Sequence, residues 1–120
     1  MNDLLGTWKL KSLVDLVDGK KVERPYEIKG RLAYIEPNNM FVALSYLKDE
    51  GYETNFYSGK FKILSKNLIQ HEVLISSEAE RNGTYLERSF KFLDESTLEL
   101  KGKNNYNVDV KLIWGRTEDH

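Results

Sequence analysis

The chain contains no cysteine among its 120 residues. Disulfide bonds, thiol nucleophiles and thiolate metal ligands are therefore excluded. The first six residues, Met1 to Gly6, lack both the positively charged and the apolar region of a signal peptide. We therefore expect a cytoplasmic location, which the absence of cysteine fits.

Long apolar runs and an excess of one charge are also missing. No stretch approaches the ~20 apolar residues that cross a bilayer, so we expect no membrane insertion. The net charge is -1, which leaves no broad basic face for nucleic acid. Histidine occurs only at His71 and His120, without an acidic cluster nearby in the sequence. The sequence therefore predicts no metal site and no cofactor.

The sequence does contain repeated hydrophobic alternation. In residues 7–14, Trp8, Leu10, Ser12 and Val14 share one face, the period-2 pattern of a half-buried strand. Seven further stretches alternate in the same way. Their predicted inward residues are Leu32, Tyr34; Met40, Val42, Leu44, Tyr46; Tyr57, Gly59, Phe61, Ile63; Ile69, His71, Val73, Ile75; Leu86, Arg88, Phe90, Phe92; Leu98, Leu100; and Val108, Val110, Leu112, Trp114.

Turn signals separate these stretches. We expect a short turn or 3-10 segment at Asp3 to Leu5, a loop from Lys48 to Asn55, and a tight hairpin at Asn82-Gly83. Further turns fall at Asp18-Gly19 and Asn104-Asn105. Strands joined by short turns predict an all-β, eight-stranded antiparallel up-and-down β-barrel occupying one domain, residues 1–120. A two-sheet sandwich is the alternative, but its long crossover connections are not visible.

Motifs at both ends and along the middle resemble those of a known family. Leu4 to Leu10 reads Leu-Leu-Gly-Thr-Trp-Lys-Leu, and Trp114-Gly115-Arg116 closes the last strand. Together with the Gly30 to Tyr34 stretch, His71 and Arg88, the chain resembles the bacterial lipocalin-like domain family of the calycin superfamily. The resemblance implies a lipocalin-like barrel in which Arg116 packs over the Trp8 ring and closes one end.

The predicted inward face combines apolar residues with a few polar ones. Small-ligand pockets have this composition, so we expect an apolar or amphipathic ligand inside the barrel. Arg88, His71 and a tyrosine would recognise a carboxylate or carbonyl group. Alternatively, Arg88 extends to the rim and the tyrosines reach water. The candidate ligand-binding residues are Ser12, Tyr34, Tyr46, Tyr57, Phe61, His71, Arg88, Phe90 and Leu112.

Register decides how far His71 lies from Arg88. A two-residue hairpin at Asn82-Gly83 would place Arg88 opposite Ser77, and a longer loop could place it opposite His71. Both arrangements keep His71 and Arg88 on one face of the sheet.

Two other classes of function remain open. Calycin-type barrels can host cyclase or isomerase chemistry, with His71 or a tyrosine as acid or base, although binding is the favoured interpretation. A filled barrel acting through its outside is the structural alternative. Phe41, Leu47 and Phe56 would then form a homodimer contact, because exposed apolar clusters often mark interfaces.

Overall fold

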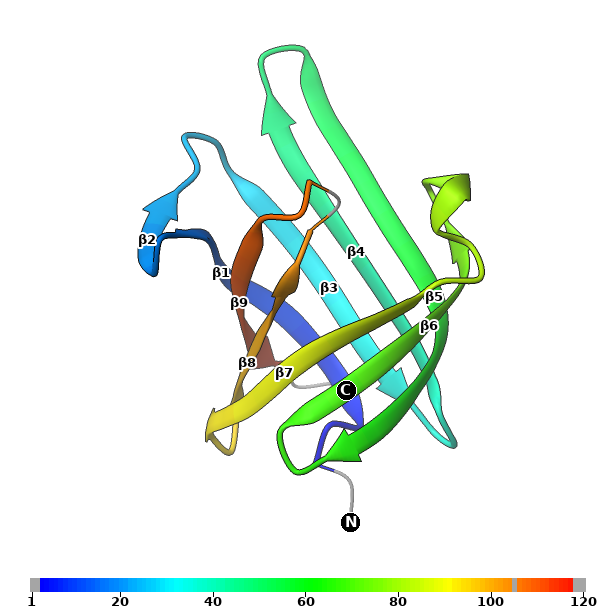
Figure 1. Cartoon of the computed structure of the whole chain (residues 1–120). Coiled ribbons are helices and arrows are strands. Elements are labelled where there is room, and N and C mark those ends of the chain that lie inside the picture. Colours follow the sequence, from blue (N-terminus) through cyan, green and yellow to red (C-terminus); the bar gives the residue numbers. More distant parts are fainter. Residues whose placement is uncertain (1–2, 105, 118–120) are drawn as a thin grey trace.

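The structure, a computed structural model, describes residues 3–104 and 106–117. Nine strands form one antiparallel sheet in the order β2-β1-β3-β4-β5-β6-β7-β8-β9, and a β1–β9 pairing closes it into a barrel (Figure 1). The strands are β1 (Gly6–Val17), β2 (Lys20–Glu23), β3 (Ile28–Ile35), β4 (Asn39–Lys48), β5 (Gly51–Ser65), β6 (Leu68–Ser76), β7 (Tyr85–Asp94), β8 (Thr97–Lys103) and β9 (Asp109–Arg116).

The predicted eight-stranded up-and-down barrel is confirmed, with one short strand added. The extra strand, β2, pairs only with the end of β1, through Val14↔Glu23 to Val17↔Lys20. The turn that joins them has positive φ at Asp18 and Gly19, 52° and 79°, as a tight hairpin requires. The predicted Asp18-Gly19 turn is therefore confirmed. None of the helices among the described residues is long and apolar enough to cross a membrane.

A β-bulge in β1 changes which residues face inward. The pairing of β1 with β9 shifts between Leu10 and Ser12, so one extra residue reverses the alternation. Ser12 is exposed on the outer surface, whereas Leu13 and Asp15 face the interior. The inward placements of Ser12 and Val14 were therefore wrong, because alternation within a strand does not reveal an inserted residue.

The β4–β5 hairpin replaces most of the predicted loop between Lys48 and Asn55. Pairing continues to Lys48↔Gly51, and the hairpin extends beyond the rest of the barrel (Figure 1). Polar cross-strand pairs stabilise this extension, including a 2.6 Å hydrogen bond between the hydroxyls of Ser45 and Thr54. The loop prediction was wrong because these strands are polar where the hairpin leaves the core.

The β6–β7 connection also differs from the predicted tight hairpin. It contains a 3-10 turn, η1 (Ala79–Arg81), and the strands pair as His71↔Leu86 and Ile69↔Arg88. Arg88 therefore lies opposite neither Ser77 nor His71, and both predicted registers were wrong. His71 and Arg88 nevertheless share the inward face, as predicted, because paired residues point to the same side of a sheet.

A second bulge explains the exposure of Ile75. The β5–β6 register shifts between Ser58 and Gly59. A Cβ atom added at Gly59 would lie 1.8 Å from the carbonyl oxygen of Glu72. Only glycine fits this close backbone approach. After the shift Ile75 points outward and is 61% exposed. Its predicted inward position was wrong for the same reason as that of Ser12.

Large buried side chains fill one end of the barrel. Trp8 is completely buried and donates a 3.1 Å hydrogen bond from Nε1 to the carbonyl oxygen of Leu4. The Arg116 guanidinium carbon lies 4.1 Å from the Trp8 ring centroid, and Nη1 donates to the Leu5 carbonyl at 2.9 Å. The Trp8–Arg116 stack that the resemblance implied is present, and this arrangement forms the closed end.

Candidate functional site

The other half of the barrel encloses a cavity of about 780 Å³. Its walls come from strands on opposite sides of the barrel, because alternate residues of every strand point inward. The volume lies within the range of small-molecule sites. The aliphatic wall residues are Leu13, Val22, Leu32, Val42, Leu44, Leu100, Val108, Val110 and Leu112.

A hydrogen-bonded cluster of three buried residues interrupts the apolar wall. Tyr34 Oη lies 2.7 Å from His71 Nε2, and Tyr57 Oη lies 2.7 Å from His71 Nδ1. His71 and Tyr57 line the cavity, whereas Tyr34 lies beneath it and is 1% exposed. The three residues come from β3, β5 and β6, so the closure of the barrel brings them together.

Burial holds the cluster in its neutral form. Burial, together with the nearby positive charge of Arg88, lowers the pKa of His71 to about 3. Burial also raises the pKa values of both phenols, and Arg88 opposes that rise. At neutral pH, His71 therefore carries one N–H donor and one nitrogen acceptor.

Arg88 lies beside this cluster, where β7 and β8 separate. β7 pairs with β8 from Ser89 to Asp94, and the residues of β7 before Ser89 diverge from β8 (Figure 1). The Arg88 side chain lies against Gly102, where an added Cβ would be 2.5 Å from Arg88 Cδ. Arg88 lines both the cavity and an outer groove of about 500 Å³.

The guanidinium of Arg88 forms no ion pair among the described residues. Its Nη1 donates to the Glu87 carbonyl oxygen at 3.1 Å. The ion pairs found within residues 3–104 and 106–117 include neither Arg88 nor Arg81, the other arginine beside Tyr57. The Arg81 guanidinium carbon lies 5.4 Å from the Tyr57 ring centroid. Positive charge thus gathers around the Tyr57 hydroxyl.

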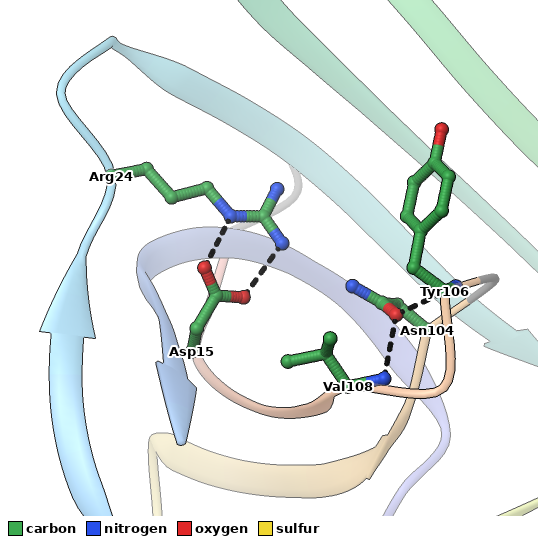
Figure 2. A network of polar contacts seen from close by, with 5 residues as sticks. All are labelled: Asp15, Arg24, Asn104, Tyr106 and Val108. Atoms are coloured by element: carbon green, nitrogen blue, oxygen red, sulfur yellow. Dashed lines mark hydrogen bonds and ion pairs between the residues drawn. The ribbon is translucent and has the colours of Figure 1, made fainter. Parts of the chain in front are cut away.

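A second polar group forms the mouth of the cavity (Figure 2). Arg24 Nε and Nη2 donate to the two carboxylate oxygens of Asp15 at 3.1 and 2.9 Å. These hydrogen bonds raise the pKa of Arg24 above its ordinary value. The guanidinium also lies 5.6 Å from the Tyr46 ring centroid, and Tyr26 packs edge-on against that ring. The ion pair anchors the β2–β3 connection to β1.

The β8–β9 turn lies beside this pair (Figure 2), because β9 pairs with the same end of β1 through Leu16↔Asp109. Asn104 Oδ1 accepts hydrogen bonds from the backbone nitrogens of Tyr106 and Val108, at 2.9 and 3.0 Å. An Asn side chain that mimics a backbone acceptor is a common turn device. Of the other residues named from sequence, Asn105 and His120 lie outside the described residues.

The structure distributes the predicted site residues over three locations. Five line the cavity: Tyr46, Tyr57, His71, Arg88 and Leu112. Three are buried without lining it: Tyr34, Phe61 and Phe90. Phe61 packs edge-on against Tyr34, with ring centroids 4.9 Å apart. Ser12 alone lies on the outer surface.

Sequence reasoning missed Asp15, Arg24 and Arg81 as residues of the cavity. Asp15 follows the stretch of residues 7–14 whose faces were predicted, and the bulge that turns it inward is not visible in the alternation. The segment around Arg24-Pro25 did carry a signal, since proline excludes it from a continuing ladder. Within the described part of the chain, no group of three His, Cys, Asp or Glu side chains could hold a metal ion.

Comparisons with known proteins give a fold but no family. No family model matches the chain, and no curated protein matches it. A redesigned β-barrel aligns with a TM-score of 0.61 and 13% identity, covering 97% of this chain and 93% of that chain. A de novo designed fluorescence-activating β-barrel aligns at 0.59 and 17%, covering 98% and 100%.

A natural protein is also similar in structure. The siderocalin Ex-FABP, which functions through dual ligand specificities, aligns with a TM-score of 0.57 and 14% identity, covering 99% of this chain and 77% of that chain. The closed antiparallel barrel and these alignments define the chain as a protein with a calycin-like fold. At sequence identities this low, the structural similarity establishes the fold alone.

Proposed function

We propose that this protein binds a small, largely apolar molecule with one polar end inside its barrel. The observation that carries the proposal is the cavity of about 780 Å³, whose aliphatic walls contain a buried Tyr57–His71 pair beside Arg88. An apolar body would contact the walls, and the polar end would meet this cluster, which is the usual division of labour in ligand pockets.

The structural neighbours support binding as the type of activity. One neighbour functions through dual ligand specificities, and a redesigned barrel with a TM-score of 0.53 is bound to DFHBI. We propose further that this chain is a cytoplasmic member of the bacterial lipocalin-like domain family, acting as one domain over residues 1–120.

A cavity-filling substitution tests the proposal. Leu112→Trp places a larger side chain in the cavity, whereas Ile113→Trp places it on the opposite face of the same strand. With a panel of single-chain amphiphiles, the natural protein and Ile113→Trp should show bound ligand in native mass spectrometry and a rise in melting temperature. Leu112→Trp should show neither. Absence of binding by every amphiphile would overturn the proposal.

A further inference from the structure

The direction of the hydrogen bonds in the Tyr34–His71–Tyr57 cluster has a consequence for the ligand. A neutral imidazole donates from one nitrogen and accepts at the other. Two arrangements are therefore available. Either Tyr34 donates to Nε2 and Nδ1–H donates to Tyr57, or Tyr57 donates to Nδ1 and Nε2–H donates to Tyr34. Each arrangement leaves one phenolic proton without a partner inside the cluster.

Burial distinguishes the two arrangements. The second arrangement leaves the unused proton on Tyr34, which is 1% exposed and does not line the cavity. Among the described residues, the Tyr34 hydroxyl has no hydrogen-bond partner other than His71. An unsatisfied buried donor costs about 1–3 kcal/mol. The first arrangement leaves the unused proton on Tyr57, which lines the cavity and can donate to a molecule there. The first arrangement is therefore favoured.

In this arrangement Tyr57 and Arg88 both present hydrogen-bond donors to the cavity. The Tyr57 oxygen accepts the Nδ1–H bond, so its proton points elsewhere, and a donor that also accepts is strengthened. Arg88 beside it supplies guanidinium N–H groups and has no carboxylate partner among the described ion pairs. Arg81 adds a second positive charge above the Tyr57 ring.

We propose that His71 is a positioning residue that holds Tyr57 as a hydrogen-bond donor, so that the cavity selects an amphiphile ending in a carboxylate. This inference rests on the proposed binding function. A carboxylate has two planar oxygens, one for the Tyr57 hydroxyl and the other for the Arg88 guanidinium. A phosphate has more oxygens and more charge than these two groups satisfy, and an ammonium has no acceptor for Tyr57.

Three ligands with the same ten-carbon tail test the selection: decanoate, decanol and decylammonium. Isothermal titration calorimetry on the whole chain at pH 7.5 should show decanoate binding about tenfold or more tightly than decanol, because hydrogen bonds to charged groups are the stronger ones. Decylammonium should bind most weakly. Equal affinities for all three would overturn the carboxylate proposal but leave the binding function standing. No binding by any of them would overturn both.

Matched variants separate the role of Tyr57 from a general loss of packing. Tyr57→Phe and Tyr34→Phe each remove one hydroxyl bonded to the same imidazole. Tyr57→Phe should weaken decanoate binding about tenfold, and Tyr34→Phe should weaken it distinctly less. An equal loss in both variants would show that the cluster acts only by supporting the fold. Arg88→Met should reduce the decanoate preference over decanol, and an unchanged preference would also overturn the proposal.

The tautomer of His71 can be read directly in the natural protein. Nitrogen-15 NMR of the imidazole should show a neutral ring protonated at Nδ1. Protonation at Nε2 would reverse the cluster and overturn the proposal, even if every variant failed to fold. His71→Gln retains one donor and one acceptor, so it should preserve more of the decanoate preference than His71→Phe. An equal loss in those two variants would contradict a positioning role.

Discussion

The two ends of the barrel are built by the same strands but differ in how those strands pair. At the closed end, Trp8 on β1 pairs with Leu32 on one side and with Arg116 on the other. At the open end, β1 no longer pairs with β3 beyond Lys9 and pairs with β2 instead. The residues of β7 before Ser89 do not pair with β8. Continuous ladders bring side chains close enough to fill the interior, whereas diverging strands leave the space that forms the cavity.

The contrast predicts that stability resides at the closed end. Trp8→Ala should lower the free energy of unfolding by about 3–5 kcal/mol, since it removes a fully buried aromatic ring and its stack with Arg116. Urea denaturation measures this loss. Phe41→Ala is the control, because Phe41 is 41% exposed on the outer face and its truncation should cost under about 0.5 kcal/mol. Similar losses in both variants would contradict the comparison.

The buried cluster between the two ends should make stability depend on pH. His71 has a pKa of about 3 in the folded protein, against about 6.5 when unfolded. Between these values only the unfolded chain binds the proton, so stability falls as pH decreases below about 6.5. We expect a loss of about 2–3 kcal/mol from pH 7.5 to 4.5, measured by urea denaturation at each pH.

The variant His71→Gln isolates this effect from the other titrating groups. Glutamine cannot take up a proton in this range, and its amide offers a donor and an acceptor to the two tyrosines. The variant should lose less stability over the same pH interval than the natural protein does. Parallel pH profiles would show that His71 is not the group responsible.

Truncation at the open end should have a smaller effect than at the closed end. Leu13 lines the cavity and is only partly buried, so Leu13→Ala should cost about 1 kcal/mol. The existing cavity already leaves part of this side chain without packing partners. A loss as large as that of Trp8→Ala in urea denaturation would mean that the open end is packed as tightly as the closed end.

The Asp15–Arg24 pair at the mouth should contribute least. Its side chains are 21% and 17% exposed, so water screens part of their attraction. Arg24→Met should cost about 0.5–1 kcal/mol. The difference from the natural protein should shrink as sodium chloride is added, because salt screens charge pairs near the surface. A difference that does not change with salt would assign the effect to packing of the side-chain stem.

The predicted homodimer would use the outer face of β4 and β5. Phe41, Leu47 and Phe56 are each about two-fifths exposed there, at 41%, 39% and 39%. The dimer stays a prediction, and light scattering at several protein concentrations measures it.

Alternation predicted the fold well because each strand keeps one face toward a common interior. The inward residues of β7 and β9 follow this pattern, including Phe90, Leu112 and Trp114. Prediction failed at Ser12 and Ile75, each of which follows a bulge. A bulge adds one residue to one strand only, and it is stabilised by contacts with the partner strand. The alternation within the bulged strand therefore does not reveal it. The hydrogen-bonded cluster was missed as a unit for a related reason, because its three residues meet only when the barrel closes.

The family resemblance implied that Trp8 and Arg116 seal one end. By itself, the sequence determined eight alternating strands and a set of polar side chains that point inward. These follow from local period and from residue chemistry. Only the tertiary structure decided that Tyr34 and Tyr57 bind opposite nitrogens of His71, that Arg88 lies against Gly102, and that Asp15 faces the mouth. The physical reason is register: which residues meet across a barrel depends on bulges and strand divergence that distant packing stabilises.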